Sequence, residues 1–374
     1  MERLKLQRML GAVALASLMT GCSVPSALVP GAARDRTQAM RHAANAYLYV
    51  AQCCGLFNPG DVAVYGPGLH QVARRIKEKQ LYPMSIGLDT SGTLYVLDES
   101  AAYGGGIAVS EFDGGGTERS RRITGLYWGV TIALDSMDDL YVANCNTCVD
   151  SGERGLTGTQ DSVTVYAPHS TSLLRTITQG VDVPSSMAID AAGDVYVANL
   201  GPPTAPRPSL TVYAAGSTSL LRKVTKGMKN PAALATDGGG DLYVANGSAE
   251  VDEYAPQLRK VLRRITKSIA SPQALAVDGA GVLYVANSQS YPLPGFISVY
   301  EPGSTVAKYR IVRGIDQPEG LALDDSGDLY VADVDWGYPP PGWVSEYRPG
   351  GRRPIGIVKM RRYGGPFHLQ IGSN

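Results

Sequence analysis

The hexapeptide D-L-Y-V-A-N occupies Asp139 to Asn144 and recurs, letter for letter, at Asp241 to Asn246. Close copies stand at L-Y-V-A-Q (Leu48 to Gln52), L-Y-V-L-D (Leu94 to Asp98), V-Y-V-A-N (Val195 to Asn199), L-Y-V-A-N (Leu283 to Asn287) and L-Y-V-A-D (Leu329 to Asp333). Alternating β-branched and aromatic residues favour a strand, so the phrase predicts seven equivalent strands. Leu and Val face one side and Tyr and Ala the other, which indicates that both faces of each sheet are packed.

Each copy belongs to a longer repeat. It reads P-x-x-(L/M)-A-x-D-x-x-G, then the phrase, a variable loop, V-x-V-Y-A-P-G and L-L-R-x-I-T-x-G, and residues 184–227 show it most clearly. Four short strands per unit, with a period of about 40 to 55 residues, are typical of a four-stranded propeller blade. In the D-x-x-G segments we expect turns and not calcium loops, because Asp accepts backbone hydrogen bonds and Gly adopts positive φ.

The two ends of the chain each carry part of a blade. Residues 366–374 align with the first strand of the preceding unit, and the first repeat begins at Tyr47 without such a strand. We therefore expect one blade built from Phe367 to Ile371, Tyr47 to Gln52, Asp61 to Tyr65 and about Gln71 to Lys77, which removes the free sheet edges. The prediction is an all-β, seven-bladed β-propeller that forms a single domain over residues 45–374.

The N-terminus resembles a bacterial lipoprotein signal. Arg3, Lys5 and Arg8 precede an apolar run, and Gly21 stands before Cys22, as in a lipobox. This predicts a signal peptide over residues 1–22, lipidation of Cys22, a flexible tether over residues 23–44, and an extracytoplasmic protein at the outer membrane or cell surface. An ordinary signal peptide with an incidental cysteine is the alternative. The 34 basic and 34 acidic residues cancel, so nucleic-acid binding is not expected, and we expect a monomer.

The repeats resemble NHL-repeat and related "YVAN" propellers, whose neighbourhood includes streptogramin-lyase-like and gluconolactonase-like enzymes as well as binding proteins. The resemblance implies the fold but is weak evidence for an activity, because the shared residues are those that form the blades. It also implies that the loops between the last strand of one blade and the first of the next share a face with those between the second and third strands. This face is called the top face below.

Polar residues at the end of each repeated phrase would lie on the top face. The candidate ring comprises Gln52, Asp98, Asn144, Asn199, Asn246, Asn287 and Asp333, with Gln273, Glu319 and His368 nearer the axis. Gluconolactonase-like relatives imply that such oxygens hold a divalent cation, and Ca²⁺ is the candidate here. Because the Asn recurs in nearly every blade, we favour a structural role in which it bonds loop backbone. No cofactor is predicted under that interpretation.

Catalytic motifs are sparse. His368 is the one histidine expected near the mouth, since His42 precedes the repeats and His70 and His169 follow third strands on the opposite face. A single histidine is no catalytic constellation, and neither G-x-S-x-G nor H-E-x-x-H is present.

The variable loops differ most between repeats. Candidate rim contacts are Tyr103, Tyr291, Trp336, Tyr338 and Trp343, whose rings suit a protein, peptide or glycan or else fold back over the mouth. The four cysteines after Cys22 are Cys53, Cys54, Cys145 and Cys148, for which we expect structural disulfides of undetermined pairing. The sequence favours a non-catalytic binding module that uses its top face; the alternative is a metal-dependent lactonase- or lyase-like enzyme at the axial mouth.

Overall fold

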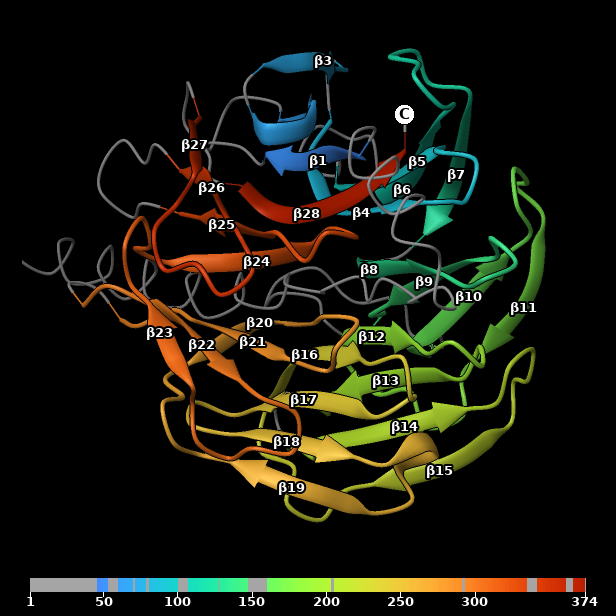
Figure 1. Ribbon diagram of the computed structural model, residues 1–374. Helices are drawn as coiled ribbons and strands as arrows, with labels where there is room; N and C mark the ends of the chain where they lie inside the picture. Colours follow the sequence, from blue (N-terminus) through green and yellow to red (C-terminus); the bar gives the residue numbers. More distant parts are fainter. Residues whose placement is uncertain are drawn as a thin grey trace, which may run out of the picture.

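The computed structural model describes residues 46–52, 60–69, 71–78, 81–99, 107–126, 128–146, 160–202, 205–290, 293–334, 342–360 and 366–373. They form seven antiparallel sheets of four strands each, set as blades around an axis (Figure 1). The predicted seven-bladed propeller is confirmed. The short 3-10 turns η2 (Pro67–Leu69) and η4 (Pro256–Leu258) lie between consecutive strands, and no helix of the described residues is long and apolar enough to cross a membrane.

The strands of each blade run from the axis outward in the order a, b, c, d. Blade 1 contains β28 (Pro366–Ser373), β1 (Ala46–Gln52), β2 (Asp61–Tyr65) and β3 (Val72–Ile76). Blade 2 contains β4 (Pro83–Leu88), β5 (Leu94–Glu99), β6 (Ile107–Phe112) and β7 (Arg121–Leu126). Blade 3 contains β8 (Gly129–Leu134), β9 (Leu140–Asn144), β10 (Ser162–Tyr166) and β11 (Leu173–Ile177). Blade 4 contains β12 (Pro184–Ile189), β13 (Val195–Asn199), β14 (Ser209–Tyr213) and β15 (Leu220–Val224).

The remaining three blades follow the same order. Blade 5 contains β16 (Pro231–Thr236), β17 (Leu242–Asn246), β18 (Val251–Tyr254) and β19 (Val261–Ile265). Blade 6 contains β20 (Pro272–Val277), β21 (Leu283–Asn287), β22 (Phe296–Tyr300) and β23 (Tyr309–Ile311). Blade 7 contains β24 (Pro318–Leu323), β25 (Leu329–Asp333), β26 (Trp343–Tyr347) and β27 (Gly356–Lys359).

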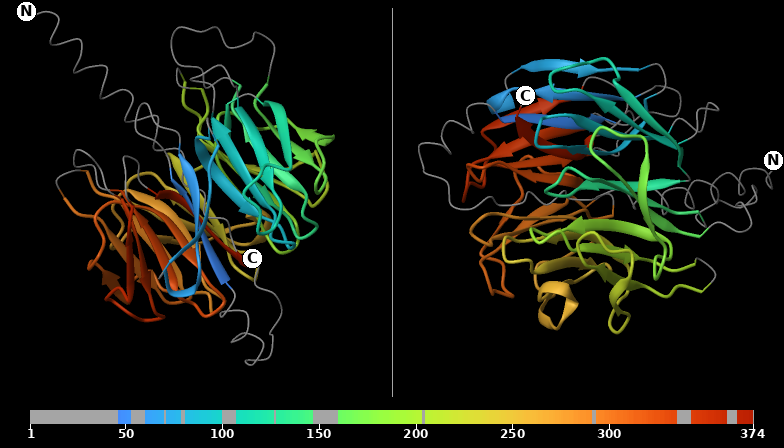
Figure 2. Two further views of the ribbon diagram at one scale, coloured as in Figure 1. Left: turned by 90° about the horizontal axis from the view of Figure 1, so that it is seen from above. Right: turned by 90° about the vertical axis from the view of Figure 1, so that its right-hand side faces the viewer.

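Blade 1 closes the ring with strands from both ends of the chain. β28 pairs antiparallel with β1, so that Leu48 faces Ile371 and Val50 faces Leu369. Figures 1 and 2 show the red C-terminal strand beside the blue N-terminal one. The predicted composite blade is confirmed, and its bounds differ from the expected ones by one or two residues. Closure leaves no blade with an unpaired a strand.

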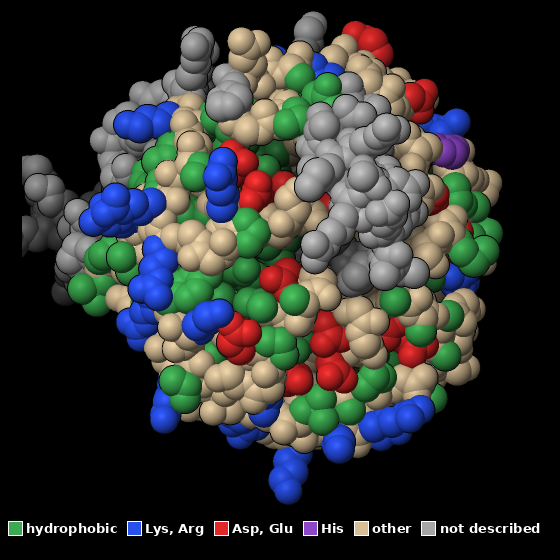
Figure 3. All heavy atoms as spheres, viewed as in Figure 1, with side chains coloured by type: hydrophobic (Ala, Val, Ile, Leu, Met, Phe, Trp, Pro, Cys, Tyr) green, Lys and Arg blue, Asp and Glu red, His purple; other side chains and the backbone are tan. Residues whose placement is uncertain are grey.

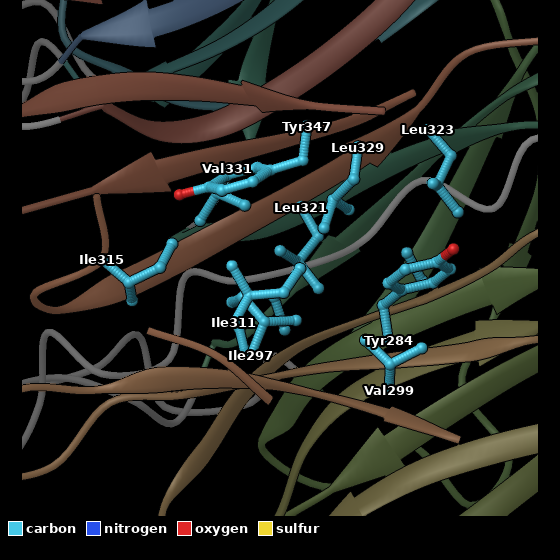
Figure 4. Packing of buried hydrophobic residues seen from close by; sticks show 13 residues of the cluster. Tyr284, Ile297, Val299, Ile311, Ile315, Leu321, Leu323, Leu329, Val331 and Tyr347 are labelled. Carbon is cyan, nitrogen blue, oxygen red and sulfur yellow. The ribbon is translucent and has the colours of Figure 1, made fainter. Parts of the chain in front are cut away.

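The repeated phrase is strand b of each blade, and both of its faces are packed. In blade 6, Tyr284 and Ala286 join a cluster with Leu329 and Val331 of blade 7 (Figure 4). On the other face of blade 6, Leu283 and Val285 pack against blade 5. The alternation expected from the sequence is therefore confirmed, and it explains why the strand residues before the last letter of the phrase are aliphatic or tyrosine.

The D-x-x-G segments are structural turns, as predicted. Asp190 Oδ1 accepts hydrogen bonds from the backbone N–H groups of Ala192 at 2.9 Å and Asp194 at 3.0 Å, and Tyr196 donates its hydroxyl to Asp190 Oδ2 at 2.9 Å. Gly193 takes the positive φ of 83° that the turn requires. The tyrosine of strand b thus joins the turn to its own sheet. The same aspartate–tyrosine contact recurs at Asp89, Asp135, Asp237, Asp278 and Asp324.

Candidate functional site

The top face brings together the end of strand b and the connection that precedes strand a. After β13, the N–H of Leu200 donates to the carbonyl of Val183 at 2.9 Å, and after β25 the N–H of Val334 donates to the carbonyl of Gln317 at 2.9 Å. The D-x-x-G turns lie on the opposite face, where Gln257 of η4 donates to Asp194 at 2.9 Å. The arrangement of loops that the resemblance implied is therefore observed.

The last residue of the repeated phrase fastens the connection before strand a of its own blade. Asn199 Oδ1 accepts the N–H of Asp182 at 2.9 Å, and Asn287 Oδ1 accepts the N–H of Ala270 at 2.8 Å. In each case the donor stands two residues before the proline that opens strand a. Asn246 with Lys229 and Asp333 with Asp316 repeat this contact at 2.8 Å. The backbone N–H at the equivalent position is the donor in all four blades. The Oδ1 atom that could have bound a cation therefore already accepts a hydrogen bond.

The amide nitrogens of these asparagines are directed into the blade. Asn199 Nδ2 donates to the carbonyl of Val197 at 3.2 Å and to Thr211 Oγ1 at 3.2 Å, and the side chain is fully buried. Asn144 and Asn287 make the equivalent donations to Val142 and Val285. For Asn144, the backbone donor that would match Asp182 belongs to Tyr127, which lies outside the described residues.

Blade 5 departs from this pattern because its b-to-c loop is short. Asn246 Nδ2 donates to Glu250 Oε1 at 2.8 Å and to Asp252 Oδ2 at 2.7 Å, and both carboxylates are buried. Lys229 Nζ lies 2.7 Å from Glu250, and Arg264 Nε lies 2.7 Å from Asp252. Sequence reasoning missed this group of charges, although two acids within six residues of a phrase-ending Asn were a visible signal. It is an internally neutralised network on the top face.

Two phrase positions carry Asp instead of Asn, and burial raises the pKa of both. Asp98 receives the hydroxyl of Ser110 at 3.0 Å and lies 3.5 Å from Arg122, yet burial outweighs both and raises its pKa to about 6. Burial raises the pKa of Asp333 well above its usual value, although the N–H of Asp316 opposes the shift. Asp333 Oδ2 is buried without a hydrogen-bond partner among the described residues. A proton on this oxygen makes Asp333 an Asn-like donor.

Glu319 is the second residue of β24 in blade 7, and it lies next to Ser288, which directly follows β21 of blade 6. It is half-buried, and burial raises its pKa to about 7. Ser288 Oγ donates to Gln317 Oε1 at 2.6 Å and lies 3.2 Å from Glu319 Oε1. Because a hydroxyl has one proton, a neutral Glu319 can donate in turn to Ser288. We call Ser288, Gln317 and Glu319 the Glu319 corner; near neutral pH it can either donate or accept a hydrogen bond.

Two of the predicted neighbours of Glu319 have other tasks. His368 is buried in β28, and its Nδ1 accepts the N–H of Ile86 in β4 at 3.0 Å across the seam between blades 1 and 2. Burial lowers its pKa to about 4, so it is neutral at physiological pH. Gln273 is half-buried at the start of β20 and donates to the carbonyl of Ser271 at 3.3 Å. Among the described residues, no group of three His, Cys, Asp or Glu side chains could hold a metal ion.

The rim is described only in part. Trp343 begins β26, where its Nε1 donates to the carbonyl of Gly314 at 2.9 Å, so this ring fastens a top-face connection. Cys145 is buried directly after β9. The other predicted rim and cysteine residues, together with Cys22, lie outside the described residues: Tyr103, Tyr291, Trp336, Tyr338, Cys53, Cys54 and Cys148. Their contacts, the disulfides and the lipidation stay predictions.

Comparison with known proteins adds no family. No protein-family model matches the sequence, and a search of curated proteins finds no match. The resemblance to NHL-type propellers thus rests on the repeated letters and the observed fold.

Proposed function

We propose that this protein is a non-catalytic binding module that uses the top face of its propeller, at the Glu319 corner and the variable loops around it, to hold a protein, peptide or glycan. The observation that carries the proposal is the use of the recurring polar residues. In Asn199, Asn246, Asn287 and Asp333 the Oδ1 atom accepts a loop backbone N–H, and in His368 the Nδ1 atom accepts a backbone N–H across a blade seam. What differs between blades, and so can carry specificity, is the Glu319 corner and the loops.

The alternative enzyme needs oxygen ligands that converge on a metal, with an acid or base nearby. Glu319, with a pKa of about 7, is suited to proton transfer. Within the part of the chain that the structure describes, Glu319 has no second acid or base of this kind, because His368 faces the blade seam and the phrase-ending residues bond the loops. The Glu319 corner instead suits a ligand hydroxyl or amine, which can pair with a carboxyl group in either protonation state.

Binding is tested with the purified full chain against arrayed peptides and envelope glycans. We expect a ligand whose binding is lost in Glu319→Gln with Ser288→Ala, and retained in Asp325→Asn, an exposed residue in the turn on the opposite face. Equal loss in the two variants would contradict a top-face site. Metal analysis of the same preparation addresses the enzyme: a stoichiometric divalent ion whose removal abolishes turnover of a lactone would replace the binding proposal.

Location is part of the same proposal: lipid on Cys22 anchors the propeller outside the cytoplasm, where a disulfide involving Cys145 is stable. Radiolabelled palmitate should enter the wild-type chain and be absent from Cys22→Ala. Peptide mass spectrometry without reduction should find Cys145 linked to another cysteine. A labelled Cys22→Ala chain, or a free Cys145 thiol, would remove the corresponding part of the proposal.

A further inference from the structure

The neutral net charge conceals a separation of charge within the propeller. No Asp or Glu occurs between Asp194 and Asp237, a stretch that contains five basic residues, nor between Glu253 and Asp278, which contains five more. These stretches include β15 and β19, the outer strands of neighbouring blades 4 and 5. In Figure 3, Lys and Arg side chains line the lower edge, where Figure 1 places these strands, while the Asp and Glu side chains of that lower half lie nearer the axis.

Only some of the cations on this edge form ion pairs: Arg263 and Arg264 of β19 pair with Glu253 and Asp252, and Lys229 pairs with Glu250. In blades 1 and 2, Arg75 pairs with Asp61 at 3.0 Å and Arg121 pairs with Glu111 at 2.8 Å. The structure gives no ion pair, within the residues it describes, to the exposed cations Arg222, Lys223, Lys226, Lys260 and Lys267. Lys260 partly offsets the rise in pKa that burial causes at Asp241, whereas the charges of the other four are available to a partner outside the chain.

Aliphatic side chains are exposed among these cations. Leu221 of β15 is 46% exposed, and Val261 and Leu262 of β19 are 48% and 40% exposed. Leu173 and Leu174 of β11 are exposed as well, but Arg175, the cation of that strand, pairs with Asp139 at 3.4 Å. On β15 and β19 the exposed aliphatic side chains lie among cations without an ion pair in the described part of the chain, and this combination distinguishes the surface. We call Leu221, Val261, Leu262 and the five cations named above the blade 4–5 rim.

We propose that the blade 4–5 rim docks on a membrane surface that contains anionic lipids. Phosphate headgroups neutralise the lysines and arginines, while the aliphatic side chains enter the boundary between headgroups and acyl chains. A soluble polyanion would engage the cations but leave the aliphatic side chains in water, so a lipid surface accounts for both. This interaction goes beyond ligand binding at the top face, and it orients the propeller edge-on to the membrane with that face open at the side.

The test places a reporter on the rim of the full chain. Leu221→Trp is reconstituted into phosphatidylcholine vesicles with and without phosphatidylglycerol, using lipids with brominated acyl chains. We expect a blue shift and quenching of the added tryptophan only with the anionic lipid, and neither in Val72→Trp, a reporter on β3 of blade 1. The N-terminal segment is common to all variants, so a failed lipid anchor or top-face site would not mimic a failed rim.

Charge reversal identifies the residues responsible. Lys223→Glu, Lys226→Glu and Lys260→Glu together should abolish the quenching of Leu221→Trp, whereas Lys77→Glu, Lys308→Glu and Arg313→Glu, which change the net charge equally, should preserve it. Equal loss in the two sets would show that total charge alone drives binding and would overturn the proposal. So would the same blue shift with polyphosphate in the absence of vesicles, or no response to anionic lipid in a folded Leu221→Trp or Leu262→Trp chain.

Discussion

Asp333 Oδ1 accepts the backbone N–H of Asp316 at 2.8 Å, the contact that asparagine makes at the same place in blades 4, 5 and 6. The difference is the second polar atom, which in Asn287 is an amide nitrogen that donates to the carbonyl of Val285 at 3.0 Å. In Asp333 it is a buried oxygen with no partner among the described residues. A carboxylate there would face carbonyl oxygen, so blade 7 is held together best when Asp333 is protonated.

Replacement of Asp333 by Asn should therefore stabilise the protein at neutral pH. The folded-state pKa is raised above the usual 3.8, so the wild type loses stability as pH rises from about 4 toward that raised pKa, by up to about 1.4 kcal/mol per pH unit. Urea unfolding of Asp333→Asn at pH 5 and pH 8 should show a gain over wild type that grows with pH. The exposed Asp325→Asn serves as the control; a gain of the same size there, or none at pH 8, would contradict this account.

Loss of the amide in blade 4 should destabilise the protein. Asn199→Ala leaves the N–H of Asp182 without its acceptor and removes the amide that donates to Thr211 Oγ1, and an unsatisfied buried group costs about 1–3 kcal/mol. Urea unfolding measures the change, and Asn230→Ala, at an exposed position in the next blade, is the matched control. If Asn199→Ala unfolds like wild type but loses a bound divalent ion, the residue is a metal ligand after all.

His368 should make the protein sensitive to acid. Its folded-state pKa of about 4 lies below the usual 6.5, so its contribution to stability is complete above about pH 6.5 and falls as pH drops toward 4, by at most about 3 kcal/mol. Asp98 and Glu319 have raised pKa values and oppose this trend in the same window. The useful quantity is thus the difference between wild type and His368→Asn, which keeps an acceptor for the N–H of Ile86.

Between pH 7 and pH 4.5, the free energy of unfolding of the wild type should fall relative to that of His368→Asn. His368→Leu removes both the acceptor and the titration, so it should be less stable than His368→Asn at every pH. A difference between wild type and His368→Asn that stays constant from pH 7 to pH 4.5 would mean that the histidine is not held neutral in the folded protein.

The fold could be predicted because the sequence pattern of one blade recurs several times along the chain. Seven copies of one strand, and two chain ends that complement each other, specify blades and closure without reference to distant contacts. The Glu319 corner could not be predicted in the same way, since Ser288, Gln317 and Glu319 meet only once strand b of blade 6 lies beside strand a of blade 7. The blade 4–5 rim could not be predicted from the net charge either, because the net charge does not show where along the chain the basic and acidic residues lie. The identity of the Asn partner, a backbone N–H two residues before strand a, also depends on the way the loops pack.

Closure by β28 should be separable from the rest of the fold. Deletion of residues 366–374 exposes the edge of β1 and uncovers the faces that Leu369 and Ile371 bury, each worth about 1.5–3 kcal/mol, so cooperative thermal unfolding should be weakened or lost. A synthetic peptide of residues 366–374 should restore the transition in a concentration-dependent way, because it supplies the missing a strand. A scrambled peptide of the same composition is the control. If the shortened chain melts like wild type, or both peptides rescue it equally, the ring is held by the other six blades and β28 contributes little to its closure.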